Sequence, residues 1–393
     1  MKRERIEALI PLYRDGLLED TLPFWIKHAP DREYGGFLTY LDRDGSVLST
    51  DKPVWVLGRT IWLFSRLYNR VEAKAEWLEL AKHGVDFMLQ HAFDSDGRMF
   101  YSLTRDGRPL RKRRYLFTET FGVIALTEYA LASGDEEAKQ RAIDLYRLIL
   151  MYGRTPGLLS PKVYPQTRPS KVHGMPMIML ATTQVLRQLG DDELYQDVID
   201  RALFEVFHHF LKPELRALLE TVGPNGEILP GPEGRCINPG HAIETSWFIM
   251  EEGRHRGDHD LIERATQILE WSLERGWDPE FGGLLYFVDV EGKPPEPYEH
   301  DMKLWWPHTE ALYALLLAHH LTGEARFEMW YERVHEWTFT HFPDPEYGEW
   351  IGYLHRDGTV SSPVKGNMWK GPFHLPRMQL NVWKLLEEMK GGA

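Results

Sequence analysis

Five titratable side chains of this chain share one position in a repeating pattern, 12 to 16 residues after a turn glycine. Side chains at equivalent positions of a repeat that closes on itself converge on its axis, so the five predict a single pocket. Histidine takes and gives a proton near neutrality, and carboxylates and guanidinium groups can orient it or hold a negative charge that develops during a reaction. The five residues are Arg59, Glu119, His241, His308 and His374.

Tryptophan side chains accompany these groups in the segments Trp55–Arg59, Lys303–Glu310 and Trp369–Arg377, and the segment Asn238–Glu244 combines His241 with Glu244. The C–H faces of a carbohydrate pack on indole rings while its hydroxyls need His, Glu and Arg partners, so the segments favour a sugar-binding pocket. Each residue taken alone has a simpler interpretation, such as core packing for a tryptophan pair or helix capping for a histidine. His173 stands at the repeating position without aromatic neighbours.

The recurring position belongs to a repeat whose turn glycines lie 62 residues (45 to 107) or 66 residues (292 to 358) apart. One motif, residues 31–45, returns at 278–292 and 344–358, in weaker form at 93–107, and as a turn at Gly226. Aromatic and β-branched residues followed by an Asp-Gly or Glu-Gly turn are typical of a β-hairpin. The copy expected near residue 166 falls in a stretch rich in proline and glycine, 155–171, which predicts a degenerate copy or an elongated loop.

Between the hairpins, apolar residues at helical spacing predict helices in pairs. The twelve predicted helices cover residues 4–27, 55–70, 73–91, 116–133, 135–152, 174–190, 191–211, 241–256, 258–275, 304–321, 325–341 and 372–389. Neither terminal helix resembles the polar cap of an open stack, so we expect the ring to close. The sequence therefore predicts an all-α (α/α)6 barrel with short β-hairpins at one end, formed by residues 1–393 as a single catalytic domain.

Composition argues against several classes of function. The chain carries 46 Lys+Arg and 59 Asp+Glu, a net charge of −13, without a long basic run, which argues against a nucleic-acid partner. Its one cysteine, Cys236, permits no internal disulfide and no cysteine-based zinc site, and no run of 18 apolar residues predicts a membrane span. We expect a soluble cytoplasmic protein without metal or cofactor, because His241 and Glu244 share a helix face but no third ligand follows at metal spacing. The oligomeric state stays open, with a homodimer among the options.

Four long motifs resemble the N-acylglucosamine 2-epimerase family, also called renin-binding protein. They are Asn238–Glu244, Met302–Ala311, Asp344–Trp350 and Lys370–Arg377, and the resemblance extends over nearly the whole chain, including Val54–Trp62. It implies an (α/α)6 barrel, no metal, and interconversion of sugars that differ at C2. Cellobiose 2-epimerases, mannose 2-epimerases and aldose–ketose isomerases are relatives of this family.

The resemblance also implies roles for individual residues. His241 and His374 match the two histidines that act as acid and base, and Glu244 matches a carboxylate one turn later, expected to fix the tautomer of His241 or raise its basicity. Arg59 and Glu310 match residues important for activity. The predicted substrate-binding residues are Trp55, Glu119, His173, Trp306, His308 and Trp369, of which Trp306 and Trp369 resemble sugar-stacking tryptophans.

The predicted reaction removes the C2 proton of an open-chain sugar and returns a proton to the opposite face of an enediolate. We expect His241 and His374 to face each other across C2, and Arg59, with His308 as a second candidate, to polarise O1.

Two departures from relatives bear on the substrate. Gly174–Met177 stands where cellobiose epimerases carry His-x-His and resembles the acylglucosamine type, whereas Trp369 replaces a phenylalanine of the animal enzymes. The predicted substrate is an N-acyl-D-glucosamine or N-acyl-D-mannosamine, and a mannose 2-epimerase or mannose–fructose isomerase is the main alternative. A glycoside hydrolase using Glu119, Glu244 or Glu310, and a non-enzymatic helical-repeat binding protein, are more distant alternatives.

Overall fold

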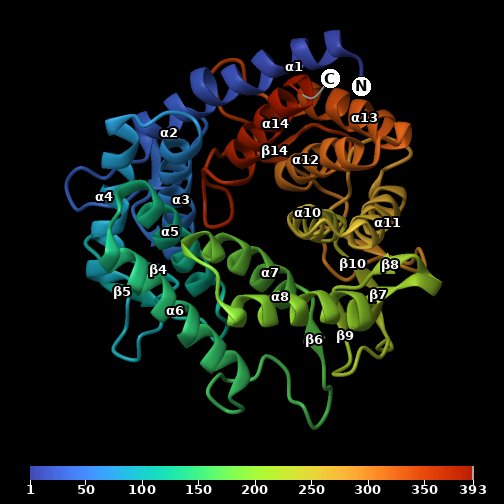
Figure 1. The fold of residues 1–393 in the computed structure, drawn as a ribbon, viewed down its shortest axis with the longest axis horizontal. Helices are drawn as coiled ribbons and strands as arrows, with labels where there is room; N and C mark the ends of the chain where they lie inside the picture. The colour runs from blue at the N-terminus through green and yellow to red at the C-terminus, as the bar shows by residue number, and fades with distance from the viewer. Residues whose placement is uncertain (392–393) are drawn as a thin grey trace.

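In the computed structural model, which describes residues 1–391, paired helices form two concentric rings (Figure 1). The outer ring consists of α1 (Arg3–Asp15) with η1 (Gly16–Thr21) and α2 (Leu22–His28), α4 (Ala75–His91), α6 (Glu136–Arg154), α8 (Glu193–Glu205) with η3 (Val206–Phe210), α11 (His259–Gly276) and α13 (Ala325–His341). The inner ring consists of α3 (Val54–Arg70), α5 (Phe117–Ser133), α7 (Gly174–Leu186) with η2 (Arg187–Leu189), α10 (Pro239–Arg256), α12 (Trp305–Thr322) and α14 (His374–Gly391). The predicted (α/α)6 barrel is confirmed.

Burial explains which helices face the axis. In the inner helix α12, every residue from Trp305 to His319 is buried, because helices pack against it on several sides. The outer helix α13 buries one stripe, which includes Phe327, Tyr331 and Val334, and exposes the rest to solvent. The inner helix α12 is therefore enclosed by its neighbours, whereas the outer helix α13 has one face in solvent.

The first and last helices close the ring. Helix α1 packs against α14 (Figure 1), and the hydroxyl groups of Tyr13 and Tyr331 form a buried hydrogen bond of 2.7 Å between α1 and α13. Arg5 adds a bidentate ion pair to Glu332 of α13, with N···O distances of 2.8 and 2.6 Å. The absence of polar caps at the two terminal helices is explained by these contacts.

A repeated ion-pair cluster joins the hairpins of neighbouring repeats. The buried carboxylate of Asp31 accepts a hydrogen bond from Lys52 Nζ at 2.9 Å and a bidentate pair from Arg105, in the next hairpin, at 3.0 Å. The same arrangement recurs as Asp278 with Lys303 and Arg356, and as Asp344 with Lys365 and Arg43. Because Arg43 belongs to the first hairpin and Asp344 to the last, this cluster also closes the ring.

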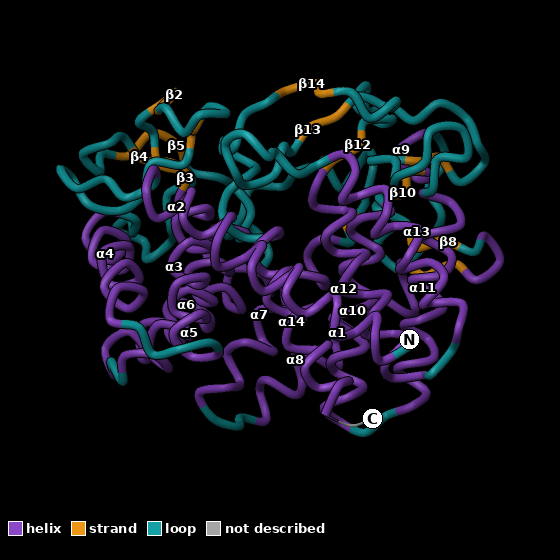
Figure 2. The backbone as a smooth tube through the Cα atoms, turned by 90° about the horizontal axis from the view of Figure 1, so that it is seen from above, coloured by secondary structure: helices purple, strands orange, loops and turns teal. Residues whose placement is uncertain are grey.

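Short strands lie at one end of the ring with the long loops, as Figure 2 shows, whereas α14 ends toward the opposite face. The antiparallel sheets are β1 (Tyr40–Leu41) with β2 (Val47–Ser49), β3 (Lys52–Pro53) with β4 (Ser102–Leu103) and β5 (Pro109–Arg111), β6 (Lys171–Val172) with β9 (Thr221–Val222), β7 (Leu211–Lys212) with β8 (Ala217–Leu218), β10 (Cys236–Ile237) with β11 (Val288–Asp289), and β12 (Lys303–Leu304) with β13 (Tyr353–Leu354) and β14 (Val360–Ser362). The short helices η4 (Pro213–Leu215) and α9 (Pro232–Arg235) complete the elements of residues 1–391.

One predicted hairpin is wrong. The copy at 278–292 turns at Gly292, but β11 pairs with β10 instead of a strand that follows it. The segment after the turn contains Pro294, Pro295 and Pro297, which have no backbone N–H to donate to a strand. The predicted hairpins at 31–45, 93–107 and 344–358 are confirmed as β1–β2, β4–β5 and β13–β14.

The stretch before β6 is an elongated loop without strands or helices from 156 to 170, which was one of the two predicted outcomes. None of the helices within residues 1–391 combines the length and the apolar character needed to cross a bilayer.

Candidate active site

The first turns of three inner helices bring two histidines to the same indole ring. The ring centroid of Trp306, on α12, lies 5.2 Å from that of His241 on α10 and 5.7 Å from that of His374 on α14. All three residues occupy the hairpin end of the ring, because the inner helices start there (Figure 2). The structure therefore brings His241, His374 and Trp306 together.

His241 is held by a helix cap and by a carboxylate. The Asn238 side chain caps α10 by accepting a hydrogen bond from the backbone N–H of His241 at 3.1 Å. The imidazole Nδ1 lies 3.1 Å from both carboxylate oxygens of Glu220, which stands between β8 and β9. Since a carboxylate only accepts, Nδ1 carries the proton, and Nε2 is left for the pocket.

Glu220 also sets the proton affinity of His241. Burial by itself lowers the pKa of His241, but the charge and hydrogen bond of Glu220, with a smaller contribution from Glu244, raise the pKa above its ordinary value. The tautomer is therefore fixed by Glu220, and the expectation that Glu244 fixes it is wrong. Glu244 acts on His241 through its charge alone.

His374 has a different set of partners. Its Nδ1 lies 2.7 Å from Glu310 Oε1, so Nδ1 again carries the proton and Nε2 stays available. Arg377, one turn later on α14, binds both Glu310, at 2.7 Å, and Glu244. Burial, followed by the positive charge of Arg377, which repels an imidazolium, holds the pKa of His374 well below its ordinary value, and the charge of Glu244 opposes this shift only in part.

Arg59 lies over aromatic faces near the same end of the ring. Its guanidinium carbon is 4.3 Å from the Phe121 ring centroid, 4.5 Å from that of Trp55 and 4.9 Å from that of Phe373. Burial lowers the pKa of Arg59 to about 9, which leaves the side chain cationic at neutral pH. Its buried Nε has no hydrogen-bond partner within residues 1–391, so this cation can bind an oxyanion.

Trp55 and Trp369 form an aromatic corner beside Arg59. Their rings meet edge to face at 5.3 Å, and the Trp55 indole N–H donates to the Met368 carbonyl at 2.8 Å. Trp369 is 55% exposed, unlike the buried Trp306, so it lies at the solvent edge. An exposed indole fixed in this way offers a face on which a sugar can pack.

His173 lies behind the His241–Glu220 pair. Its ring is fully buried, with Nε2 3.2 Å from the Thr245 hydroxyl and Nδ1 3.7 Å from Glu220 Oε1. The backbone N–H of His173 also donates to the Glu220 carbonyl at 2.9 Å. His173 thus supports Glu220.

The structure does not bring Glu119 and His308 to the histidine pair. Glu119 binds Arg98 and the backbone N–H of Met99, at 2.9 and 3.1 Å. His308 donates from Nδ1 to the Leu304 carbonyl and accepts at Nε2 from the Leu284 N–H, while its ring stacks 4.7 Å from Trp337 of the outer helix α13. Burial lowers the pKa of His308 to about 3. Both residues stand two positions from a pocket residue, Phe121 or Trp306, and a two-residue step turns a helix by about 200°.

Two residues of the site had no role assigned from the sequence, Glu220 and Arg377. Glu220 is a lone carboxylate between the apolar residues Leu218 and Leu219 on one side and Val222 on the other, which is a signal of a buried, partnered charge. Arg377 lies inside a motif, three residues after His374, and therefore on the same helix face. Either signal points to a partner without identifying it.

Within residues 1–391, one group of side chains has metal-ligating atoms within 4.8 Å of one another, namely Glu244, Glu310 and His374. The guanidinium of Arg377 already binds both carboxylates of this group. A cation would have to displace Arg377, so the donor set fits an arginine-centred network better than a metal ion.

This chain is similar in sequence and in fold to known sugar 2-epimerases. A profile of the N-acylglucosamine 2-epimerase (GlcNAc 2-epimerase) family matches residues 35–374. The N-acylglucosamine 2-epimerase of Bos taurus is 39% identical over 371 residues, which cover 92% of this chain and 87% of the bovine one. The cellobiose 2-epimerase of Dictyoglomus turgidum is 24% identical over 390 residues, with 92% and 95% coverage. The solved cellobiose 2-epimerase from Bacillus thermoamylovorans B4167 shares the fold, with a TM-score of 0.85, 23% identity, and coverage of 96% and 99%.

Proposed function

We propose, from the premise that the chain belongs to the N-acylglucosamine 2-epimerase family, that it interconverts an N-acyl-D-glucosamine and the N-acyl-D-mannosamine that differs from it at C2. Family membership makes the chain a sugar 2-epimerase. The N-acylated substrate is supported by 39% identity to the bovine N-acylglucosamine 2-epimerase, against 24% to a cellobiose 2-epimerase.

The observation that carries the proposal is the pair of imidazoles at Trp306, each with Nδ1 bound to a carboxylate and Nε2 left over. Inversion at a carbon needs one group to take the proton and another to deliver a proton on the opposite face. With the sugar ring open, the C1 aldehyde makes the C2 proton removable. His241 and His374 then supply the two groups from two different helices.

The opposite pKa directions of the two histidines suggest a resting state. His374, whose pKa is lowered, is neutral, and its Nε2 takes the C2 proton while the bonding electrons move toward O1 to give an enolate that keeps the acylamino group on C2. The raised pKa of His241 favours its protonated form, which delivers a proton from Nε2 to the other face of C2 and restores the aldehyde. The reverse reaction uses the same groups with the proton positions exchanged.

Three further residues have supporting roles in this proposal. Arg59, a buried cation with a free donor, holds the charge on O1. Trp55 and Trp369 pack on the sugar at the solvent edge, and Trp306 lies beside C2. Glu119 and His308 have no part in it, since their polar atoms are occupied elsewhere.

We also propose that the reaction needs no metal, that the chain acts as one catalytic domain, and that it works in the cytoplasm. The Arg377 network at Glu244 and Glu310 supports the first point, and closure of the ring by α1 and α14 supports the second. A single cysteine, Cys236, suits a reducing compartment.

The test is incubation of the purified chain with N-acetylmannosamine, mannose or cellobiose, followed by chromatography of the products. We expect N-acetylglucosamine to form from N-acetylmannosamine, and the other two sugars to react at least about tenfold more slowly. Preferred formation of glucose or fructose from mannose would replace the substrate by a simple hexose. No reaction with any of the three sugars would leave a binding protein as the better explanation.

A further inference from the structure

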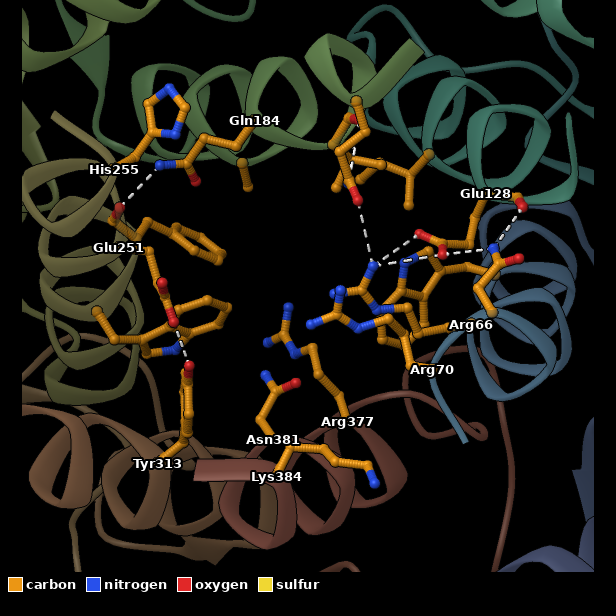
Figure 3. Close-up of a pocket in the computed structure, with 18 of the residues that line it drawn as sticks. Arg66, Arg70, Glu128, Gln184, Glu251, His255, Tyr313, Arg377, Asn381 and Lys384 are labelled. Atoms are coloured by element: carbon orange, nitrogen blue, oxygen red, sulfur yellow. Dashed lines mark hydrogen bonds and ion pairs between the residues drawn. The ribbon is translucent and has the colours of Figure 1, made fainter. Parts of the chain in front are cut away.

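A cavity of about 1030 Å³ lies between the inner helices, at the end of the ring away from the hairpins (Figure 3). Its walls are the later turns of all six inner helices. On α10 the cavity lining runs from Trp247 to His255, and Trp247 lies six residues after His241, which is about 9 Å along a helix. The cavity meets the catalytic end at Phe373 and Arg377 and at Trp247, whose indole N–H donates to Glu310. The cavity therefore adjoins the active site and shares with it Arg377 and Trp247, which both bind Glu310.

The walls offer hydrogen-bonding groups of both kinds. Amide side chains, which donate and accept, line the cavity at Asn69, Gln184, Gln188 and Asn381 (Figure 3 labels two of them). Asn381 projects from α14 and makes no hydrogen bond to any group within residues 1–391. It is thus a donor and acceptor available to a ligand.

Aromatic side chains lie among these amides. Trp62, Trp247 and Phe248 line the cavity, together with Tyr313, whose hydroxyl donates to Glu251. Aromatic faces pack on C–H groups, and the neighbouring amides and carboxylates bind hydroxyls. The same combination characterises the catalytic end of the ring.

The charged side chains that line the cavity argue against an anionic ligand. Six cationic side chains line the cavity, but Arg187, Lys384 and Arg377 are bound to carboxylates that lie outside its lining. The remaining three, Arg66, Arg70 and Arg254, face four lining carboxylates, Glu128, Asp191, Glu251 and Glu388. Glu128 accepts from Arg66 at 3.3 Å, and Glu388 pairs with Arg254. The cationic excess needed to hold a phosphate or a second carboxylate is missing.

We propose that this cavity binds a second molecule of a neutral sugar of the substrate class, an inference that rests on the proposed function for the identity of the sugar. A hydroxyl both donates and accepts, so a polyhydroxylated ligand satisfies carboxylates, guanidinium groups and amides without changing the balanced charge. The volume is at the upper end of the ~300–1,000 Å³ usual for small-molecule pockets, which leaves room for a monosaccharide and water. The bound sugar contacts Asn381, and the face of Arg377 turned away from Glu244 and Glu310.

Equilibrium dialysis with radiolabelled N-acetylglucosamine counts the sites. The full chain carrying His241→Asn is used, so that the sugar is not converted during the measurement. We expect two sugars bound per chain. Adding Asn381→Leu removes the available amide without breaking an internal hydrogen bond, and should lower the affinity of one site at least tenfold while the other is unchanged.

Two further variants keep the test decisive. Arg70→Leu changes an exposed side chain of the cavity wall and should weaken the same site, which covers the case in which Asn381→Leu folds poorly. Gln196→Leu, on the solvent-exposed side of α8, is the matched control and should retain both sites. One bound sugar in the His241→Asn chain, or two unchanged sites in both cavity variants, would overturn the proposal. Displacement of the second sugar by an equal concentration of inorganic phosphate would overturn its charge argument.

Failure of the proposed function is distinguishable from failure of this inference. It would appear in the wild-type chain as sugar that binds at both sites without conversion between N-acetylmannosamine and N-acetylglucosamine.

Discussion

The two histidines of the active site occupy equivalent positions in the repeat, but their pKa values are shifted in opposite directions. Each histidine stands in the first turn of an inner helix, contacts Trp306, and has Nδ1 bound to a glutamate. The His241 side chain is 32% exposed and its pKa is raised, whereas the His374 side chain is 11% exposed and its pKa is lowered. The difference comes from what else binds the glutamate.

Glu220 faces His241 and His173, so its negative charge is available to an imidazolium. Glu310 forms an ion pair with Arg377 and also accepts from the Trp247 indole N–H at 2.8 Å. The positive charge of Arg377 therefore offsets the effect of Glu310 on the pKa of His374. A carboxylate beside a histidine therefore does not by itself make that histidine basic. The other partner of the carboxylate matters as well: Arg377 pairs with Glu310, whereas no arginine or lysine pairs with Glu220 within residues 1–391.

Removing either imidazole should have the largest effect. His241→Asn and His374→Asn each abolish one of the two proton transfers, and we expect turnover to fall about 10³-fold, since general acid–base groups contribute ~10²–10⁴-fold. Initial rates of epimerisation, with circular dichroism to verify the fold, provide the measurement. A near-native rate in either folded variant would remove that histidine from the mechanism.

Arg377→Met should make the His374 side resemble the His241 side. Without the guanidinium, Glu310 and Glu244 raise the pKa of His374. Because His374 must be neutral to take a proton, activity is lost as the pH falls through its pKa, and the acid limb of kcat/KM moves to higher pH. We also expect kcat/KM to fall about 10²-fold at neutral pH and the free energy of unfolding to fall by about 3–5 kcal/mol, because two buried carboxylates lose their partner.

Arg187→Met is the matched control for that variant, since Arg187 pairs with the buried Glu252 away from both histidines. It should destabilise the fold without moving the acid limb. An acid limb that stays in place in Arg377→Met would show that Arg377 does not set the pKa of His374.

Glu220→Gln should impair proton delivery by His241 and leave proton removal by His374 unchanged. The amide can still accept from Nδ1–H, but the charge that raises the pKa of His241 is lost. Because His241 must be protonated to deliver its proton, activity is lost as the pH rises through its pKa, and the basic limb moves to lower pH. We expect kcat/KM to fall about tenfold at pH 8 and to change little at pH 6.

The pH profile of kcat/KM, compared with that of Glu227→Gln, checks this expectation. Glu227 is an exposed glutamate seven residues later and should leave the profile unchanged. A uniform loss of activity at every pH would indicate that Glu220 acts only through structure.

Arg43→Met should have the smallest effect, and it separates closure of the ring from chemistry. Arg43 is 38% exposed, and Lys365 remains bound to Asp344 after the change. We expect the free energy of unfolding to fall by no more than about 1 kcal/mol, with kcat/KM within about twofold of the wild type. Urea denaturation and initial rates are the measurements. A loss of kcat/KM as large as in Glu220→Gln would mean that the positions of the two histidines depend on the Arg43–Asp344 contact that closes the ring.

The helices could be predicted because their apolar period is local. Predicted ranges such as 325–341 coincide with α13, and three Asp-Gly turns give three hairpins. The pairing of β11 with β10 could not be predicted, because it joins segments about 50 residues apart through two-residue strands. Pairing of that length leaves almost no pattern in the sequence.

The sequence predicted at which end of the helices the site lies, but not which side chains at that end point toward it. His241 and His374 were found from their phase, but the same phase admitted Glu119 and His308, because an uncertainty of two residues is half a turn of a helix. Glu220 was missed because its contact with His241 is made by an irregular segment between short strands. Spacing identifies the end of a helix, and only the packed structure identifies the side.

The most direct test of the two-sided site is C2–H exchange with D2O in the single variants. If each histidine serves one face of C2, His241→Asn should exchange the C2 proton of one epimer with solvent, and His374→Asn that of the other, both without inversion. Proton NMR of N-acetylglucosamine and N-acetylmannosamine incubated separately with each folded variant gives the readout. Exchange of the same epimer by both variants, or inversion by either one at an undiminished rate, would contradict the assignment of one histidine to each face.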